Sequence, residues 1–274
     1  MTIEPLQADD IASFLKMASA ENWVAEPWEF TYLLSVFPAG CFCMRDSDGK
    51  GIAFVTSLQH EKSGWIGNLI VADEFRGKGI GDALFRKVLE ALQAAGVETF
   101  WLTASNMGRS LYERYGFCSI DSIVRWVGTG RQRHTSYGQN SASITAAPSV
   151  ISIDSHSWGD RRESLLAATM ARGRVVREES GFIVVQLCGE ALQLGPFSAL
   201  NCSTAEVLYE TALRTIPLGT KVFLDAPVSN RSALRLFNRR GMRIAGRNEL
   251  MYAGVKPDYR PEMLYGLATM GSCG

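Results

Sequence analysis

Residues 68–81 read NLIVADEFRGKGIG, an apolar stretch that runs into a basic turn rich in glycine. From Gly81 onward, apolar residues recur at helical spacing as far as Ala95, and Gly96 supplies a stop. The segment therefore predicts a strand, a tight turn and a long helix in that order. Such a turn points several backbone N–H groups at one place, where the helix N-terminus adds unpaired donors and the positive end of its dipole. We expect this place to bind a phosphate or diphosphate group.

Three kinds of phosphate loop compete for this segment. A P-loop needs a longer loop that ends in Lys followed by Ser or Thr, which is absent here. A dinucleotide fingerprint has two residues between its last two glycines, whereas Gly77, Gly79 and Gly81 are separated by single residues. What remains is Arg-x-x-Gly-x-Gly, in which the glycines allow close backbone approach, and Arg76 and Lys78 add positive charge.

The composition is that of an ordinary globular protein of 274 residues, and at about 150 residues per domain it suggests two domains. The 28 basic and 28 acidic residues balance, so the net charge gives no case for nucleic acid or an anionic membrane. No apolar run approaches the roughly 20 residues that span a bilayer, and the first residues lack the layout of a secretory signal. We expect a cytoplasmic location, no nucleic-acid or membrane partner, six reduced cysteines and no metal site.

The chain divides at residues 128–150, which are rich in Gly, Ser, Thr, Asn and Gln and predict a linker. The second half echoes the first, because residues 221–226 and 236–242 repeat the order of residue types in 99–104 and 111–117. Coincidence stays open, but duplication is the better interpretation and predicts two similar α/β domains. In the first half we expect helices at 8–20, 28–37, 81–95 and 109–115, and strands at 41–45, 51–59, 64–71, 99–103 and 120–127.

Taken together, these motifs resemble the GNAT acetyltransferase superfamily. The resemblance rests on Arg76, Gly79 and Gly81, on the acidic pair at 73–74 and on Leu-Tyr-Glu-Arg-Tyr-Gly-Phe at 111–117. Residues 151–255 are similar to the second domain of tandem GNAT proteins. The resemblance implies an α/β fold with two tandem GNAT-like domains, each a mixed, mostly antiparallel twisted sheet flanked by helices. It assigns residues 1–127 to a catalytic domain that binds acetyl-CoA, 128–150 to the linker and 151–274 to a degenerate GNAT-like domain.

Acetyl-CoA is the co-substrate that the resemblance implies. Its diphosphate would lie on the amides of residues 77–81, and its pantetheine arm in a gap between residues 69–71 and the strand ending near Thr103. Tyr112 occupies the position of the family's tyrosine, which implies a general acid for the departing thiolate; a packed aromatic residue is the alternative. A backbone N–H on residues 69–71 is implied to meet the oxyanion. The implied contacts to acetyl-CoA are Leu69, Ile70, Val71, Arg76, Gly77, Lys78, Gly79, Ile80 and Gly81.

The acceptor side is less determined. Many members of the family carry an acidic residue on the strand before the glycine turn, but this chain has Trp-Ile-Gly-Asn at 65–68. Glu26 and Glu29 lie where the family places its substrate-covering segment, and would attract an ammonium or accept its proton through water. Solvated carboxylates at a helix start are the alternative. Trp23 and Trp28 either line an acceptor pocket or pack in the core.

The second half lacks the corresponding features. Residues 201–206 read NCSTAE, which predicts a capping box formed by Ser203 and Glu206 and offers no glycine cradle. Phe237 stands at the counterpart of Tyr112. We therefore expect this half not to catalyse, and instead to shape the acceptor pocket or bind a regulator.

The sequence thus predicts an N-acetyltransferase that moves an acetyl group from acetyl-CoA to a primary amine of a small molecule, by direct attack in a ternary complex. This reaction needs a neutral amine, a stabilised oxyanion and a proton for the thiolate. One alternative is a non-catalytic acyl-CoA-binding sensor, which would bind the donor without releasing CoA. A nucleotide-binding regulatory module is another. The oligomeric state is not predicted.

Overall fold

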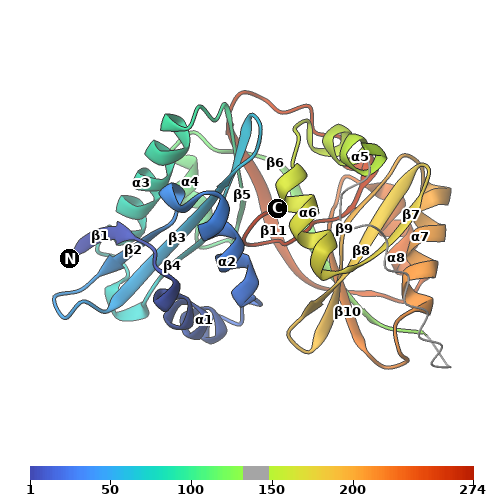
Figure 1. The fold of residues 1–274 in the computed structure, drawn as a ribbon, viewed down its shortest axis with the longest axis horizontal. Helices are drawn as coiled ribbons and strands as arrows, with labels where there is room; N and C mark the ends of the chain where they lie inside the picture. The colour runs from blue at the N-terminus through green and yellow to red at the C-terminus, as the bar shows by residue number, and fades with distance from the viewer. Residues whose placement is uncertain (132–147) are drawn as a thin grey trace.

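The computed structural model describes residues 1–131 and 148–274 (Figure 1). Most of the segment predicted as a linker, residues 132–147, lies outside the described residues. Its described ends are the last two residues of one strand with the two residues after it, and the first residues of a helix. The domain boundaries drawn from the sequence therefore stay a prediction. All six cysteines are free thiols, and four of them are buried.

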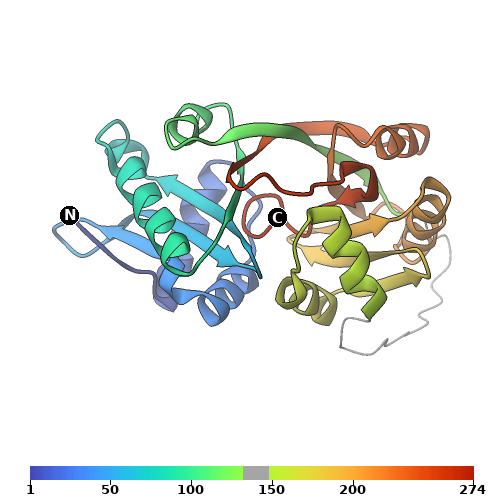
Figure 2. The same ribbon diagram turned by 90° about the horizontal axis from the view of Figure 1, so that it is seen from above.

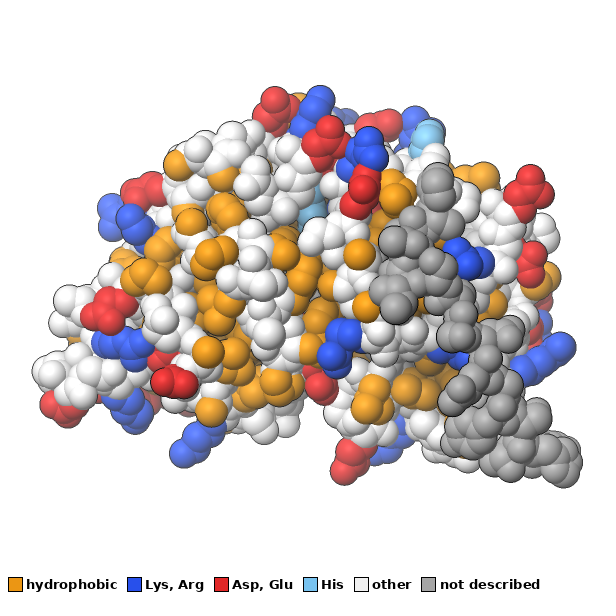
Figure 3. Space-filling view, in the orientation of Figure 1, with side chains coloured by type: hydrophobic (Ala, Val, Ile, Leu, Met, Phe, Trp, Pro, Cys, Tyr) orange, Lys and Arg blue, Asp and Glu red, His pale blue; other side chains and the backbone are white. Residues whose placement is uncertain are grey.

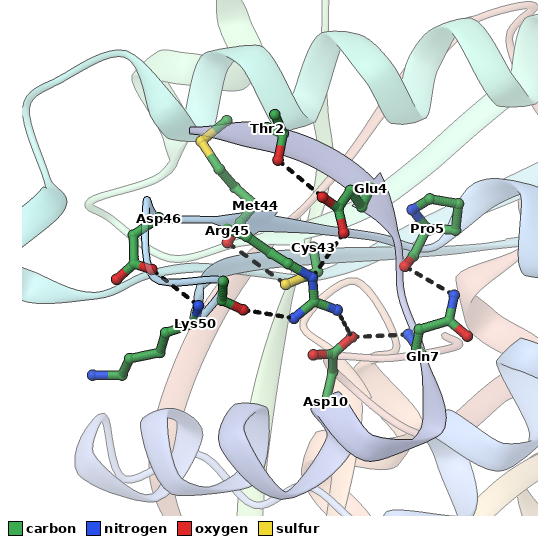
Figure 4. Close-up of polar contacts among 11 residues, drawn as sticks. Thr2, Glu4, Pro5, Gln7, Asp10, Cys43, Met44, Arg45, Asp46 and Lys50 are labelled. Carbon is green, nitrogen blue, oxygen red and sulfur yellow. Dashed lines mark hydrogen bonds and ion pairs between the residues drawn. The ribbon is translucent and has the colours of Figure 1, made fainter.

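The first half contains the predicted elements with boundaries shifted by a few residues, and one further strand at its start. That strand was not predicted because its four residues are too few to show a period and include a proline. Arg45 holds it in place by donating to Glu4 at 2.9 Å and to Asp10 at 2.8 Å (Figure 4). The elements are β1 (Thr2–Pro5), α1 (Ile11–Ala20), α2 (Pro27–Val36), β2 (Phe42–Arg45), β3 (Gly51–Gln59), β4 (Ser63–Val71), α3 (Ile80–Ala94), β5 (Thr99–Ala104), α4 (Arg109–Glu113) and β6 (Cys118–Thr129).

The second half repeats this order of strands and helices, except that it lacks a counterpart of β1 and ends in an additional strand. Its elements are α5 (Pro148–Trp158), α6 (Glu163–Arg172), β7 (Arg174–Glu178), β8 (Gly181–Cys188), β9 (Ala191–Ala199), α7 (Cys202–Arg214), β10 (Lys221–Pro227), α8 (Arg231–Arg239), β11 (Arg243–Gly254) and β12 (Leu264–Gly266). In Figure 1, α3 and α7 lie at opposite ends of the molecule, each against the sheet of its own half. The predicted fold class is confirmed: mixed, mostly antiparallel sheet flanked by helices in two halves.

Strand alternation explains why helices cover both faces of the sheet. On β2, Phe42 and Met44 pack in the core that contains α3, whereas Cys43 packs in the core that contains α1 and α2. β3 is buried over nearly its whole length because both of its faces are covered.

Two long strands cross between the halves. β6 pairs with β10 of the second half, and β11 pairs with β5 of the first, so that the order is β1-β2-β3-β4-β5-β11-β6-β10-β9-β8-β7. β6 and β11 also pair with each other, and Figure 2 shows them side by side between the halves. We call this arrangement the strand exchange. Local sequence patterns did not predict it, since they do not specify which of two equivalent neighbours a strand pairs with.

Buried contacts between the halves accompany the strand exchange. Trp158 of α5 packs edge-on against Trp65 at 6.1 Å and Trp101 at 5.6 Å between ring centroids. Asp160 accepts hydrogen bonds from the backbone N–H and hydroxyl of Ser63 at 2.7 and 2.6 Å. The two halves thus share one buried aromatic cluster.

One face of the molecule is drawn in Figure 3. Acidic and basic groups are intermixed there, mostly around the margin, and hydrophobic side chains gather nearer its centre. Of the helices that the structure describes, none has the length and apolar character needed to cross a membrane.

Candidate functional site

The parallel pairing of β4 and β5 stops partway along both strands. Residues 63–65 pair with 99–101, and beyond these the two strands separate. A cavity of about 580 Å³ lies in the opening, lined by residues 66–71 of β4, by Thr103 of β5 and by the turn before α3. A cavity therefore occupies the gap that the family resemblance implied.

A β-bulge bends β4 beside this cavity. The pairing with β3 jumps from Gly67–Thr56 to Ile70–Phe54, and Asn68 has a φ of 57°. This is the left-handed region, which asparagine tolerates better than most residues with side chains. Asn68 also donates to the Thr56 hydroxyl at 2.9 Å. The bulge is thus held from both its backbone and its side chain.

The glycine turn presents free backbone donors at the start of α3. Gly77 and Gly79 have φ values of 73° and 77°, which only glycine adopts without strain. Within residues 1–131 and 148–274, no acceptor receives a hydrogen bond from the N–H groups of residues 77–81, and Gly79 caps α3 without any side-chain bond. Unpaired N–H groups at a helix N-terminus form an anion-binding cradle.

The basic residues of the turn are held by neighbouring groups. Arg76 donates to the Val71 carbonyl at 2.9 Å and forms ion pairs with Glu21 and Asp73. Lys78 donates to the Glu74 carbonyl at 2.9 Å. The positive potential of the cradle therefore comes mainly from the N–H groups and the helix dipole. The predicted contacts that line the cavity are Leu69, Ile70, Val71, Arg76, Gly77, Gly79, Ile80 and Gly81; Lys78 does not line it.

Tyr112 of α4 also lines the cavity. Its ring packs against Phe85 of α3 at 4.9 Å between centroids. Burial raises the pKa of the Tyr112 phenol to about 12. The hydroxyl therefore keeps its proton near neutral pH, as a proton donor must.

The end of the cavity away from the turn is walled by residues remote in sequence. Arg125 of β6, Asn248 of β11 and residues 270–272 line it. Thr103 donates to the Met270 carbonyl at 2.6 Å. A Cβ on Gly67 would lie 2.2 Å from the Gly271 carbonyl oxygen, so only glycine lets the two segments approach. We call residues 270–272 the tail segment. The sequence did not predict it, because it carries no motif.

Of the four predicted acceptor residues, the structure brings Trp23 to the cavity wall. Trp28 instead packs on Tyr32 and under the Arg172 guanidinium. Glu26 accepts from the Gly189 N–H of the second half. Neither Glu26 nor Trp28 is part of the cavity lining.

The fourth predicted acceptor residue is Glu29, which is only 4% exposed. It accepts a hydrogen bond from the hydroxyl of Ser272, which does line the cavity. Burial raises the pKa of Glu29 to about 7, against the lowering effect of the Ser272 hydrogen bond. The carboxylate is therefore one hydrogen bond away from the cavity and titrates near neutral pH.

We call the opening between the separated strands of each half its slot. In the second half, the slot lies between β9 and β10 and is filled by the chain itself. β9 and β10 pair only at 192–193 and 222–223 and then separate. β12 occupies the opening, where it pairs with β9, and the Leu267 N–H donates to the Asp225 carbonyl at 2.9 Å. A Cβ on Gly195 would lie 1.9 Å from the Leu267 carbonyl oxygen. The space that is a cavity in the first half is solid here.

The helix that follows this slot is capped by its own side chain, although the predicted capping box is wrong in its residues. Asn201 is the N-cap of α7 and accepts from the Thr204 N–H at 2.9 Å. Ser203 donates to Asn201, and Glu206 pairs with Arg240 instead. The helix begins earlier than the sequence indicated, so the cap falls two residues earlier.

Two buried carboxylates of the second half, Asp225 and Asp154, are paired with arginines. Arg125 and Asp225 form two hydrogen bonds of 2.8 Å, with the Asp225 side chain fully buried. Arg162 and Asp154 form a second such pair. No cluster of three or more His, Cys, Asp or Glu side chains among the described residues is arranged to hold a metal ion.

Comparison with known proteins identifies both halves. The family model of an acetyltransferase (GNAT) domain matches residues 38–119, and a second acetyltransferase (GNAT) model matches residues 150–266. Holothin acyltransferase of Pseudoalteromonas sp. (strain SANK 73390) is 23% identical over 279 residues, which cover 93% of this chain and 92% of that protein. An uncharacterized N-acetyltransferase of Methanocaldococcus jannaschii is 25% identical over 148 residues, or 46% of this chain and 64% of that protein.

Comparison with solved structures also finds acetyltransferases. A putative acetyltransferase from Pyrococcus horikoshii matches with a TM-score of 0.85 and 25% identity, over 100% of this chain and 95% of that one. A GCN5-related N-acetyltransferase from Sphaerobacter thermophilus matches with a TM-score of 0.65 and 16% identity, over 94% of this chain and 98% of that one, and shows the fold alone.

Proposed function

The chain belongs to the GNAT acetyltransferase family as a tandem member, and from that premise we propose that it transfers an acetyl group from acetyl-CoA to a primary amine of a small molecule. Family membership makes the chain an acyltransferase that uses an acyl-CoA. The acetyl group, the amine acceptor and direct attack within a ternary complex are the content of the proposal.

One observation supports it most directly: the free N–H groups of residues 77–81, the separated strands β4 and β5, and Tyr112 all border a single cavity. The N–H groups would hold the diphosphate of the donor, and the edge of β4 its pantetheine arm. Tyr112 would give its proton to the departing thiolate, and a backbone N–H of β4 would stabilise the oxyanion.

The form of the acceptor end supports a small acceptor. The tail segment and Arg125 wall this end, and Trp23 adds an apolar side. The whole cavity of about 580 Å³ is of the size that usually binds small molecules, roughly 300–1,000 Å³. The same cavity borders the cradle for the diphosphate and the edge of β4 for the pantetheine arm, so only part of its volume is left for the acceptor, which favours a compact amine.

We assign the catalytic role to residues 1–127 and a non-catalytic one to 151–274. This division is supported by the contrast between the open slot of the first half and the filled slot of the second. The first half is nevertheless incomplete alone, because β11 and the tail segment reach its site from beyond residue 240.

The test is the release of free CoA thiol from acetyl-CoA, measured with the full chain over a panel of amino acids, polyamines, aminoglycosides and peptides. We expect release that depends on a small primary amine, with the acetylated amine identified by mass spectrometry. Binding of acetyl-CoA without release in the presence of any acceptor would contradict the proposal.

A further inference from the structure

The acceptor end of the cavity contains a hydroxyl that is bonded to a buried carboxylate. Ser272 lines the cavity, and its hydroxyl donates to Glu29 Oε2 and lies 3.2 Å from Asn68 Oδ1. Among the ion pairs that the structure describes none involves Glu29, so its buried carboxylate has no cationic partner and is satisfied by hydrogen bonds. The hydrogen bond from Ser272 links this carboxylate directly to a group that lines the cavity.

We propose that Ser272 binds the acceptor amine and relays one of its protons to Glu29. This inference rests on the proposed function and amends its division of roles in one respect, because it makes Ser272, within residues 151–274, part of the catalytic site. In the step, an N–H bond of the acceptor ammonium breaks and an O–H bond forms at Ser272 Oγ, while Ser272 gives its own hydrogen to Glu29 Oε2. The ammonium and carboxylate become a neutral amine and a carboxylic acid, so charge is conserved.

The remaining steps need no other reactant. The neutral amine attacks the thioester carbonyl, forming the C–N bond, and collapse of the tetrahedral intermediate breaks the C–S bond. The thiolate takes the Tyr112 proton, and the extra proton on the new amide nitrogen replaces it. Glu29 later returns its proton to solvent.

Backbone and side-chain contacts hold Ser272 in place. Met270 accepts from Thr103, the Cys273 N–H donates to the Thr269 hydroxyl at 2.8 Å, and Gly271 lies directly over Gly67. The hydroxyl is therefore positioned before an acceptor arrives, which is what efficient proton transfer requires.

The surroundings of Glu29 set the pH range of the relay. Burial dominates and raises its pKa to about 7, so the carboxylate accepts protons above that pH and is already protonated below it. Hydrogen bonds from Ser272 and from the backbone of Glu26, the residue before α2, lower this pKa; the Glu26 charge raises it slightly, and Arg172 on α6 lowers it. The other charged or titratable groups coupled to Glu29 are Arg125 of β6, Cys188 of β8 and Cys273 beside the tail segment.

The experiment compares Ser272→Ala with Ser272→Thr, which keeps the hydroxyl, in the full chain with an amine found active in the thiol-release panel. We expect Ser272→Ala to lower kcat/KM for the amine by about 10²-fold, with little change in the Kd of acetyl-CoA by calorimetry. Ser272→Thr should retain most of the activity. The wild-type kcat/KM should rise with pH through an inflection near the Glu29 pKa of about 7, and this inflection should be lost in Ser272→Ala and Glu29→Gln.

The outcomes that would overturn the relay alone differ from those that would also overturn the proposed function. An active wild type with Ser272→Ala unchanged, or with the inflection retained in Glu29→Gln, overturns the relay alone. Acetyl-CoA that modifies Ser272 covalently without acceptor, seen by intact mass, also overturns it, since Ser272 would then be a nucleophile. A wild type that releases CoA with no amine overturns the proposed function and the relay together. If Ser272→Ala does not fold, as judged by its melting curve, Glu29→Gln tests the relay through the pH profile.

Discussion

The two halves of the molecule have the same slot between strands, and they use it in opposite ways. In the first half, β4 and β5 separate around a cavity, the helix beyond has free N–H groups, and Tyr112 faces the opening. In the second half, β9 and β10 separate around β12, Asn201 caps the helix, and Phe237 is fully buried between Trp126 and Tyr209. The fold is common to both, so under the proposed function the ability to hold an acyl-CoA depends on whether the slot is empty and its N–H donors are free.

The largest effect is expected from a substitution that blocks the free N–H donors of residues 77–81 in the first half. Gly79→Glu should abolish acetyl-CoA binding, lowering affinity beyond calorimetric detection, because it places bulk and negative charge at the cradle. Gly96→Glu is the matched control: Gly96 has a φ of 80° against 77° for Gly79, and it lies at the other end of α3. Equal loss of binding in both variants would attribute the effect to backbone strain and refute the cradle.

A smaller effect, on kcat, is expected from substituting Tyr112, and none from substituting Phe237, its counterpart in the second half. Tyr112→Phe is expected to lower kcat by about 10²-fold through loss of the general acid, while the Kd of acetyl-CoA stays close to that of the wild type. Phe237→Tyr, at the position of the second half that corresponds to Tyr112, should leave kcat unchanged. Steady-state kinetics with a common amine decide the matter: undiminished turnover in Tyr112→Phe makes this side chain a packed aromatic only.

The buried carboxylates beside the two slots should differ in their effect on stability. Glu29 has a pKa near 7 in the folded chain against 4.5 as its ordinary value, so folding takes up a proton and the wild type loses stability as pH rises between these values. Glu29→Gln removes this loss, and we expect it to raise the free energy of unfolding by about 1–3 kcal/mol at about pH 8 but not at about pH 4. Urea titrations at both pH values measure this.

Asp225 provides the control of opposite sign. Asp225→Asn leaves Arg125 without its carboxylate partner and should lower stability. If Glu29→Gln also destabilises the chain at the higher pH, Glu29 makes stabilising contacts and its carboxylate is part of the packing.

The smallest effect concerns the cap of α7. Asn201→Ala should lower the free energy of unfolding by about 1 kcal/mol, because the Thr204 N–H loses its acceptor. The Kd of acetyl-CoA should not change, since this helix binds none. Ser203→Ala leaves the cap in place and should cost less. Altered acetyl-CoA affinity in Asn201→Ala would show that the second half takes part in binding.

The features that could be predicted from the sequence are those that depend on adjacent residues. The turn at 76–81 was predictable because glycine with positive φ, a following amphipathic helix and basic neighbours all leave direct traces in adjacent residues. The capping box failed because the helix start was misplaced, and a cap depends on the exact residue at that start.

The acceptor end of the cavity was harder to predict from the sequence, because segments that are distant along the chain form it. Glu29 looked like an ordinary helix-start carboxylate, and only the fold shows it buried beneath Ser272. The tail segment and β12 lack any motif, and the positions that admit them are Gly67 and Gly195, whose role appears only when a neighbouring carbonyl is seen against them. Glycine within a strand was the one available signal, since it often marks close backbone approach.

The strand exchange has a consequence for how the protein is made. During synthesis β5 emerges long before β11, its neighbour in the finished sheet, so one edge of β5 stays unpaired until Arg243–Gly254 has left the ribosome. Exposed strand edges promote aggregation of nascent chains. Neither half can complete its sheet first, and coexpressed fragments cut between 131 and 148 should be soluble only together.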